Sequence, residues 1–398
     1  MKNFLKDLGK NLDKVGREFK ELERLFSDDS EARAVRRLVF YAESSIYYRY
    51  YEDYIDYILN NSDLAICYIT SDAEDQIFDV AKAQPRIKPF YLKNMLAGAF
   101  ARLDGKVLVL TAPDLNSGAI KRAPHPVHHV YTFHGLSSAH HYFRPGAFDH
   151  YDAMLCLGQY QVAEVRKTEE IYGLKNKELV VAGYPRIEHI WREHQEYRRL
   201  GNQANQRRVC LIAPSWWWDA RESNLLEGPI EDLFEEFGKT DFEVWLRPHP
   251  EYIKRYGKRV DEIAKIIERY PNISLKTDLP SMQVLHEADV LITDHSSICF
   301  DFALGTERPV VFVDTPAHTG NPEYQKVGIE PVENAYRSRL GVRIKPEEIR
   351  SMPKIIEDLL ANQDDFRAKL PLIRDELLAN WQHAAEVGGR YLIDKAKN

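Results

Sequence analysis

The feature of this chain that most constrains its fold is a regular alternation of short apolar runs with longer amphipathic segments. In the first half these runs are RRLVFYAESS, LAICYITSD, KVLVLTAPDL, HHVYTFHG and YDAMLCLG. Buried apolar runs separated by helical segments are typical of βα units around a parallel sheet. The pattern therefore predicts an α/β domain over residues 31–190.

The second half repeats the alternation with the runs RRVCLIAPSW, DFEVWLRPHP, ISLKTD, DVLITDHSS and RPVVFVDTP. It predicts a second doubly wound domain over residues 205–345, with ligands beyond the carboxyl ends of the strands. The polar stretch at about 187–206 is expected to join the domains. Residues 346–398 are polar and helical in pattern, and we expect them to pack back across both domains.

Length and composition agree with two packed domains. The chain has 398 residues, of which 44% are hydrophobic and 29% charged, so it can bury two cores and is not intrinsically disordered. Its net charge of −7 provides no overall attraction to nucleic acid, so any phosphate site must be local. Four widely spaced cysteines in apolar runs favour a reducing cytosol.

The first 30 residues form a separate segment, predicted as an amphipathic helix. Apolar residues at steps of three and four draw one stripe along it: Phe4, Leu5, Leu8, Leu12, Val15, Phe19, Leu22 and Leu25. Charged residues interrupt its apolar residues too often for a signal-peptide core, and the chain has no run of about 20 uncharged apolar residues that would span a membrane. Two interpretations stay open: packing on this protein or a partner helix, or peripheral docking on an anionic membrane surface.

The sharpest motif is LITDHSSICFDFALG at residues 291–305, where an apolar strand runs into polar residues and then a helical pattern. Ser296 and Ser297, together with backbone N–H groups at a helix start, can form an anion site opened by Asp294. The alternative is that Asp294 or Ser296 simply caps the helix.

A second motif, VWLRPHPEY at residues 244–252, has the same strand-then-polar layout. Arg247 can bind a phosphate through two parallel N–H bonds, and flanking prolines stiffen the backbone at His249. Taken alone, Arg247 could equally be a surface ion-pair partner and His249 a turn residue. Two such strand ends in one sheet favour a phosphate site.

A third motif lies in the first half, where VYTFHGLSS at residues 130–138 places His134 after a strand. A histidine with a near-neutral pKa can accept a proton from an attacking hydroxyl. Gly135 permits a tight turn or a close backbone approach. His134 is therefore a candidate base, with a structural hydrogen-bonded histidine as the alternative.

No metal site is predicted. Seven histidines fall between His125 and His150, but they lack the spacing of a zinc site. The chain also has no Asp-x-Asp pair to hold a divalent ion on a nucleotide diphosphate. Charge neutralisation is expected from arginine, histidine, serine and helix dipoles, without a cofactor.

The ordered set FHG, FDHYDAMLCLG, AGYPR, LIAPSW, RPHP and ITDHSSICFDFAL resembles the CDP-glycerol glycerophosphotransferases of teichoic acid and capsule polymer synthesis. The resemblance implies a GT-B fold, with two facing Rossmann-like domains. It also implies metal-independent transfer, with CDP-glycerol held mainly by the C-terminal domain.

Roles carried over by position follow from this resemblance. His134 and His249 match the two catalytic histidines. Donor phosphate binding is implied for Arg247, Asp294, Ser296 and Ser297, and nucleotide binding for Pro214, Ser215, Arg186 and Thr293. The chain departs from the family pattern at Leu136 and His295, which are commonly Thr and Tyr.

The resulting expectation is transfer of glycerol phosphate from CDP-glycerol to a hydroxyl of a lipid-linked or polysaccharide acceptor, with release of CMP. The expected setting is the cytoplasm, with possible peripheral association at the inner face of the cell membrane, and no nucleic acid is expected as a partner. Two alternatives remain. One is a GT-B nucleotide-sugar glycosyltransferase, and the other is a non-catalytic peripheral membrane protein.

Overall fold

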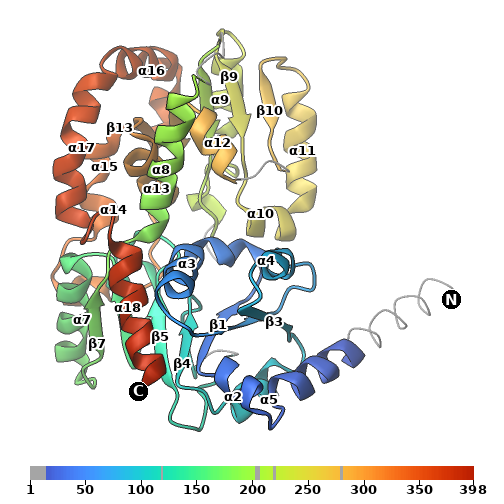
Figure 1. The fold of residues 1–398 in the computed structure, drawn as a ribbon. Helices are drawn as coiled ribbons and strands as arrows, with labels where there is room; N and C mark the ends of the chain where they lie inside the picture. Colours follow the sequence, from blue (N-terminus) through green and yellow to red (C-terminus); the bar gives the residue numbers. More distant parts are fainter. Residues whose placement is uncertain (1–14, 118–119, 202–206, 218–220, 278–280) are drawn as a thin grey trace, which may run out of the picture. The chain divides into compact units, whose positions relative to one another are not determined.

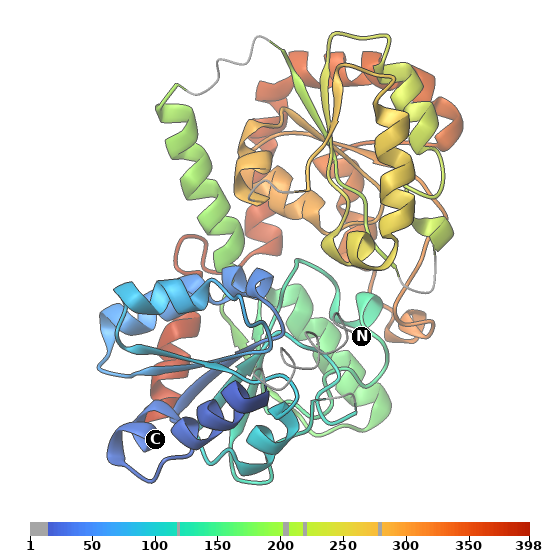
Figure 2. The same cartoon turned by 90° about the vertical axis from the view of Figure 1, so that its right-hand side faces the viewer.

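The structure, a computed structural model, describes residues 15–117, 120–201, 207–217, 221–277 and 281–398, which form two compact units (Figures 1 and 2). Unit 1 comprises the chain up to His134 with residues 143–186 and 377–398, and unit 2 comprises residues 135–142 and 187–376. The chain thus leaves unit 1 at the predicted junction near residue 187. It also contributes residues 135–142 to unit 2, which the alternation of apolar runs did not predict.

Unit 1 is built on a seven-stranded sheet in the order β3-β2-β1-β4-β5-β6-β7, and every neighbouring pair is parallel. Strands β1, β2 and β4 are buried along their whole length, as expected when helices cover both faces of a parallel sheet. The strands are β1 (Leu38–Ala42), β2 (Ile66–Thr70), β3 (Ile87–Tyr91), β4 (Val107–Leu110), β5 (His128–Thr132), β6 (Ala153–Cys156) and β7 (Glu178–Val181).

The helices of unit 1 flank this sheet (Figure 1). The last helix, α18 (Ala384–Lys397), packs on α3 (Glu52–Asn61) through two glycines, and a Cβ at Gly388 would meet the Tyr54 ring at 2.3 Å. The C-terminal helix is therefore part of the unit 1 core. The other helical segments are residues 15–25, α2 (Ser30–Val35), η1 (Ser45–Tyr50), α4 (Ile77–Ala83), α5 (Leu96–Arg102) and α7 (Gln159–Tyr172).

The predicted N-terminal stripe is only partly used for packing. Leu25 is buried at 1% exposure, but Val15 and Phe19 are 38% and 56% exposed. The buried residue at the centre of this helix is Glu18, whose carboxylate accepts hydrogen bonds from the backbone N–H groups of Lys93 and Met95, both at 2.9 Å. Leu22 is half-buried, and the other stripe residues, Phe4, Leu5, Leu8 and Leu12, lie outside the described residues. In the described part of the chain, every helix is too short or too polar to cross a bilayer.

Unit 2 contains a six-stranded, all-parallel sheet in the order β10-β9-β8-β11-β12-β13. Strand order reverses between β8 and β11, which makes this the topological switch point where α/β sheets bind ligands. The α/β class with two parallel sheets is therefore confirmed. The strands are β8 (Val209–Ile212), β9 (Glu243–Leu246), β10 (Ile273–Leu275), β11 (Val290–Thr293), β12 (Val310–Val313) and β13 (Gly341–Ile344).

The helices of unit 2 cover both faces of its sheet (Figure 2), and a cluster of aliphatic and aromatic side chains fills the space between them. They are α6 (Ala139–Tyr142), α8 (Pro185–Arg199), η2 (Arg221–Ser223), α9 (Ile230–Phe237), α10 (Pro250–Arg255), α11 (Gly257–Ile267), α12 (Ser281–Glu287), α13 (Ile298–Thr306), η3 (Tyr324–Val327), α14 (Val332–Ala335), α15 (Arg337–Leu340), η4 (Pro346–Ser351), α16 (Met352–Ala361) and α17 (Gln363–Leu377).

Three strands, β3, β7 and β13, were not predicted, and each lies at the edge of a sheet. Strand β3 contains Pro89, which lacks a backbone N–H and is tolerated at an edge. Strand β13 has the sequence GVRI, too short and polar to stand out as an apolar run. Continuous apolar runs are typical of strands that are buried on both faces. These strands are only partly buried, so their sequences do not show such a run.

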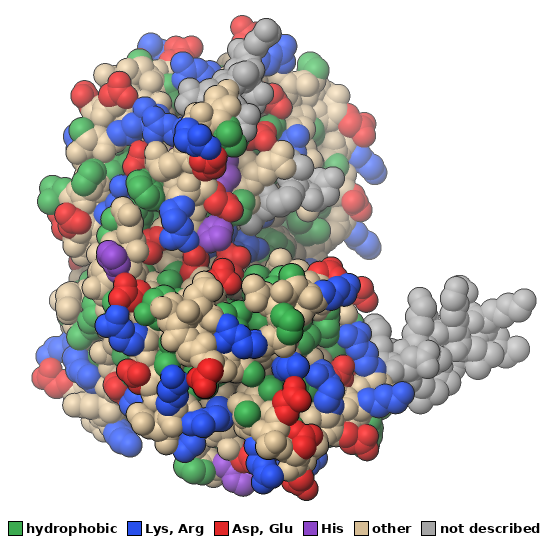
Figure 3. All heavy atoms as spheres, in the orientation of Figure 1, with side chains coloured by type: hydrophobic (Ala, Val, Ile, Leu, Met, Phe, Trp, Pro, Cys, Tyr) green, Lys and Arg blue, Asp and Glu red, His purple; other side chains and the backbone are tan. Residues whose placement is uncertain are grey.

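The surface carries mixed charge. Figure 3 shows lysine and arginine side chains interspersed with aspartate and glutamate on the face in view. All four cysteines are free and buried.

Candidate active site

His134 follows strand β5 in unit 1, and its ring is oriented by the backbone. Its Nδ1 lies 3.1 Å from the carbonyl oxygen of Thr111. A carbonyl oxygen only accepts, so Nδ1 carries the proton and Nε2 keeps its lone pair. Burial lowers the pKa of His134, while the bond to Thr111 acts in the opposite direction. A neutral imidazole with a basic Nε2 is the form that a general base requires.

Aromatic rings surround His134. Tyr47, Tyr50 and Phe143 lie with ring centroids 6.0, 6.1 and 6.1 Å from the imidazole, all edge-on. Both tyrosines belong to η1 (Ser45–Tyr50). These contacts keep the ring direction fixed and reduce its access to water.

Asp294, at the end of β11 in unit 2, organises the loops of the sheet edge. It is 0% exposed, and its two carboxylate oxygens accept backbone N–H groups of Ser215 (2.7 Å), Leu225 (2.9 Å) and His295 (2.6 Å). The carboxylate thus ties the loop after β8 to the end of β11. This geometry gives Asp294 a role in organising the loops, and its part in donor phosphate binding stays a prediction.

Ser296 and Ser297 stand at the start of α13, a nine-residue helix. Ser297 is the N-cap residue but makes no side-chain capping bond, and Ser296 Oγ makes a long 3.4 Å contact with the Ile298 N–H. Strong side-chain capping, the alternative interpretation of this motif, is therefore absent from this helix start. The helix N-terminus carries partial positive charge, which suits an anion.

Gly135 approaches this helix start closely within unit 2. A Cβ at position 135 would lie 3.0 Å from Ser297 Oγ, so a larger residue would force the serine to move. The predicted close backbone approach is confirmed. His134 precedes Gly135 by a single peptide bond.

Arg247 and His249 follow β9 in unit 2. Arg247 is half-buried, and its backbone N–H donates to the carbonyl of Ile212 at 2.8 Å, which anchors it beside β8. His249 is the N-cap of α10, where its Nδ1 accepts the Glu251 N–H at 3.1 Å. The neutral ring therefore carries its proton on Nε2. The Trp216 ring is stacked with this imidazole, with ring centroids 6.4 Å apart and an interplanar angle of 20°.

The four predicted nucleotide-binding residues fall in different places. Thr293 is buried at 0% exposure, and its hydroxyl donates to the Ala213 carbonyl at 2.7 Å. Pro214 is buried beside Ser215, whose Oγ has no hydrogen-bond partner among the described residues. Arg186 belongs to unit 1, where it is 3% exposed and lies 3.6 Å from Glu52. Three of the four thus lie at the unit 2 sheet edge, and Arg186 does not.

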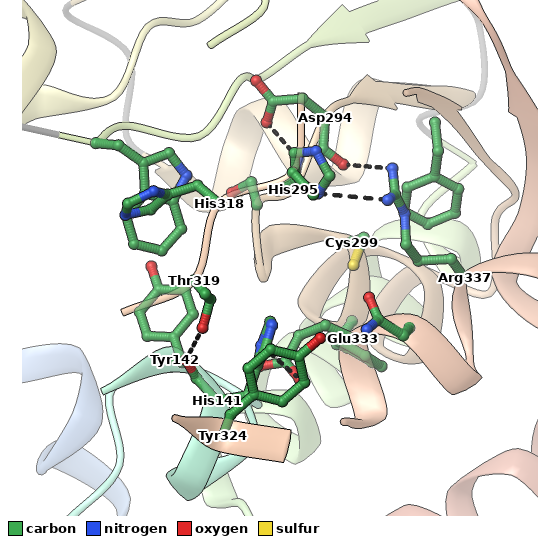
Figure 4. A pocket seen from close by; sticks show the side chains of 16 residues that line it. His141, Tyr142, Asp294, His295, Cys299, His318, Thr319, Tyr324, Glu333 and Arg337 are labelled. Carbon is green, nitrogen blue, oxygen red and sulfur yellow. Dashed lines mark hydrogen bonds and ion pairs between the residues drawn. The ribbon is translucent and has the colours of Figure 1, made fainter. Parts of the chain in front are cut away.

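A pocket in unit 2 contains residues that the motifs missed (Figure 4). Arg337 from α15 donates to the Asp294 carbonyl at 3.0 Å and lies 3.4 Å from His295 Nδ1. His295 Nε2 lies 3.0 Å from the Thr315 carbonyl, so this ring is held neutral with its proton on Nε2, and burial lowers its pKa. Arg337 lies in a segment without a motif, so no sequence signal pointed to it.

Metal binding gains no support from the histidine-rich stretch. Among the described residues, no histidine between positions 125 and 150 joins two further ligand atoms in a group compact enough for an ion.

Comparisons with known proteins match a segment that includes the two strand-end motifs of unit 2. Residues 149–319 match the family model described as CDP-Glycerol:Poly(glycerophosphate) glycerophosphotransferase. The teichoic acid glycerol-phosphate primase of Bacillus subtilis (strain 168) is 24% identical over 161 residues, which are 40% of this chain and 38% of that protein. The chain therefore matches well under half the length of this curated relative.

Solved structures share the fold across nearly the whole chain. The wall teichoic acid polymerase TagF superposes with a TM-score of 0.59 at 15% identity, covering 99% of this chain and 98% of the TagF chain. The UDP-GlcNAc 2-epimerase from Neisseria meningitidis reaches a TM-score of 0.58 at 10% identity, covering 90% and 99%. At these identities the likeness establishes the fold alone. The resemblance seen in the motifs is confirmed by the family match over residues 149–319.

Proposed function

We propose that this protein transfers glycerol phosphate from CDP-glycerol to a hydroxyl of a lipid-linked or polysaccharide acceptor, in teichoic acid or capsular polymer synthesis. The observation that carries the proposal is the family match over residues 149–319, which spans both strand ends bearing Arg247, His249, Ser296 and Ser297. We place the reaction in the cytosol, in keeping with four free, buried cysteines.

The proposed chemistry begins at His134. Its Nε2 takes the proton of the acceptor hydroxyl, and the oxygen attacks the phosphorus bonded to glycerol. The bond from that phosphorus to the bridging oxygen breaks, and CMP leaves with the electron pair. The product is a phosphodiester. Phosphoryl transfer depends mainly on positioning and on neutralising oxygen charge, which unit 2 residues would supply.

The unit 2 edge is proposed to hold the diphosphate. Arg247 and the start of α13 would neutralise its oxygens, and the Nε2–H of His249 would donate to the leaving CMP. The missing Asp-x-Asp pair supports a metal-independent reaction. We therefore expect activity to persist after EDTA treatment.

The test is incubation with a panel of CDP-alditols and nucleotide sugars, with identification of the released nucleotide by chromatography. Release of CMP from CDP-glycerol supports the proposal. Release of a nucleoside diphosphate from a sugar donor would establish a glycosyltransferase instead. Turnover of no donor, together with binding to anionic vesicles, would favour a non-catalytic peripheral protein.

A further inference from the structure

A pocket of about 110 Å³ opens at the carboxyl edge of the unit 2 sheet, beside the start of α13 (Figure 4). Every residue that lines it belongs to unit 2. By volume it accommodates several water-sized groups, enough for a short polyol chain. The residues that define its chemistry are His141, Trp217, Ser296, His318, Glu333 and Arg337.

The end of the pocket next to α13 suits an anion. Ser296 stands at the helix start, where backbone N–H groups carry partial positive charge. Arg337 is only 5% exposed; its Nη2 pairs with Asp314 at 3.2 Å, while its Nε has no hydrogen-bond partner among the described residues. A phosphate bound at the start of α13 would therefore lie at the mouth of this pocket.

The end formed by Glu333 suits neutral hydroxyl groups. Glu333 Oε1 accepts the Ser138 N–H at 2.9 Å, and Oε2 lies 3.8 Å from His141 Nδ1. Burial and neighbouring histidines lower the pKa of His141 to about 4, so this ring is neutral at pH 7. A carboxylate repels phosphate but accepts hydrogen bonds from hydroxyl groups.

An aromatic wall joins the two ends. Trp217 packs against His318 at 4.4 Å and against Tyr142 at 5.1 Å, and its Nε1 lacks a hydrogen-bond partner among the described residues. Apolar ring faces with a few convergent polar groups are typical of small-molecule sites. An indole N–H can donate to a hydroxyl oxygen, and the rings can cover the carbon chain.

The pocket lies on the β12 side of the switch point between β8 and β11, because Phe312 of β12 is among its lining residues. A second aromatic pair, Trp216 and His249, follows β8 and β9 on the other side. The start of α13 follows β11, between the two. A nucleotide donor with its diphosphate at α13 would thus extend one end toward Trp216 and the other into the pocket.

We propose that the pocket holds the polyhydroxylated group that the donor transfers, and that Glu333 is a specificity-determining residue for its hydroxyl groups. The base would then lie on the side of Trp216 and His249. This inference rests on the proposed function and assigns a place to the alditol.

The test compares two ligands, CDP and CDP-glycerol, by titration calorimetry on the full-length protein. The variant Glu333→Gln keeps the shape and the Ser138 contact but removes the charge. We expect it to weaken CDP-glycerol binding about tenfold while CDP affinity changes less than about twofold. The matched control is Glu330→Gln, at an exposed position outside the pocket, which should change neither.

Other outcomes distinguish a failure of this inference from a failure of the proposed function. Equal loss of CDP and CDP-glycerol affinity in Glu333→Gln would place the nucleotide in the pocket and overturn the inference alone. No change for either ligand would also overturn it. If the unmodified protein binds neither ligand, the proposed function fails and the inference fails with it. A second variant, His318→Ala, should likewise affect CDP-glycerol more than CDP.

Discussion

His134 and His249 each follow the carboxyl end of a parallel strand, one in unit 1 and one in unit 2, but the protein holds their rings in opposite ways. His134 donates from Nδ1 to a carbonyl, and His249 accepts a backbone N–H at Nδ1. The same residue type at the same kind of position thus presents a lone pair in one unit and a proton in the other. The hydrogen-bond partner, rather than the fold, decides which role each ring can take.

Replacing His134 by alanine tests the unit 1 half of this contrast and should have the largest effect. We expect transfer to fall about 10³-fold, as for loss of a general base, while CDP-glycerol binding changes little. CMP release and calorimetric titration measure the two quantities. The exposed His125 offers a matched control, since His125→Ala should leave both unchanged. Wild-type turnover in His134→Ala would show that another group is the base.

A variant of Asp294 tests whether its carboxylate holds the loops at the unit 2 sheet edge together. Removing its carboxylate by Asp294→Ala would leave the three backbone N–H groups of residues 215, 225 and 295 without partners. We expect a loss of about 3 kcal/mol in the free energy of unfolding, measured by urea denaturation. If stability is unchanged and only donor affinity changes, Asp294 contacts the donor instead of organising the loops.

His249 can be changed so that its two roles separate. Asparagine is a good N-cap residue, so His249→Asn should preserve the start of α10 while removing the Nε2–H donor. We expect the thermal midpoint to stay unchanged and kcat to fall about tenfold, the effect of one hydrogen bond to a charged group. An unaltered kcat would show that His249 serves only as a cap.

Much of this architecture could be predicted from the sequence. The strands that carry the candidate site, β5, β8, β9 and β11, are buried on both faces and therefore read as continuous apolar runs. Because polar residues directly follow these runs, His134, His249 and Ser296 could be singled out before their surroundings were known.

The rest depends on contacts between distant parts of the chain. The sequence did not show that Asp294 joins two loops, because its partners, the N–H groups of Ser215 and Leu225, lie about 70 to 80 positions earlier. The pocket joins His141 to Glu333 across nearly 200 residues, and neither lies in a strand-end motif. Residues 135–142 continue directly from β5, so periodicity alone did not show that they belong to unit 2.

The contrast between the two histidines can be tested directly by nuclear magnetic resonance on protein with ¹⁵N-labelled histidine. Imidazole nitrogen shifts distinguish the two neutral tautomers, and His134→Ala and His249→Asn assign the signals. The account predicts a proton on Nδ1 of His134 and on Nε2 of His249 at pH 7. A proton on Nε2 of His134 would remove its basic lone pair and contradict the account.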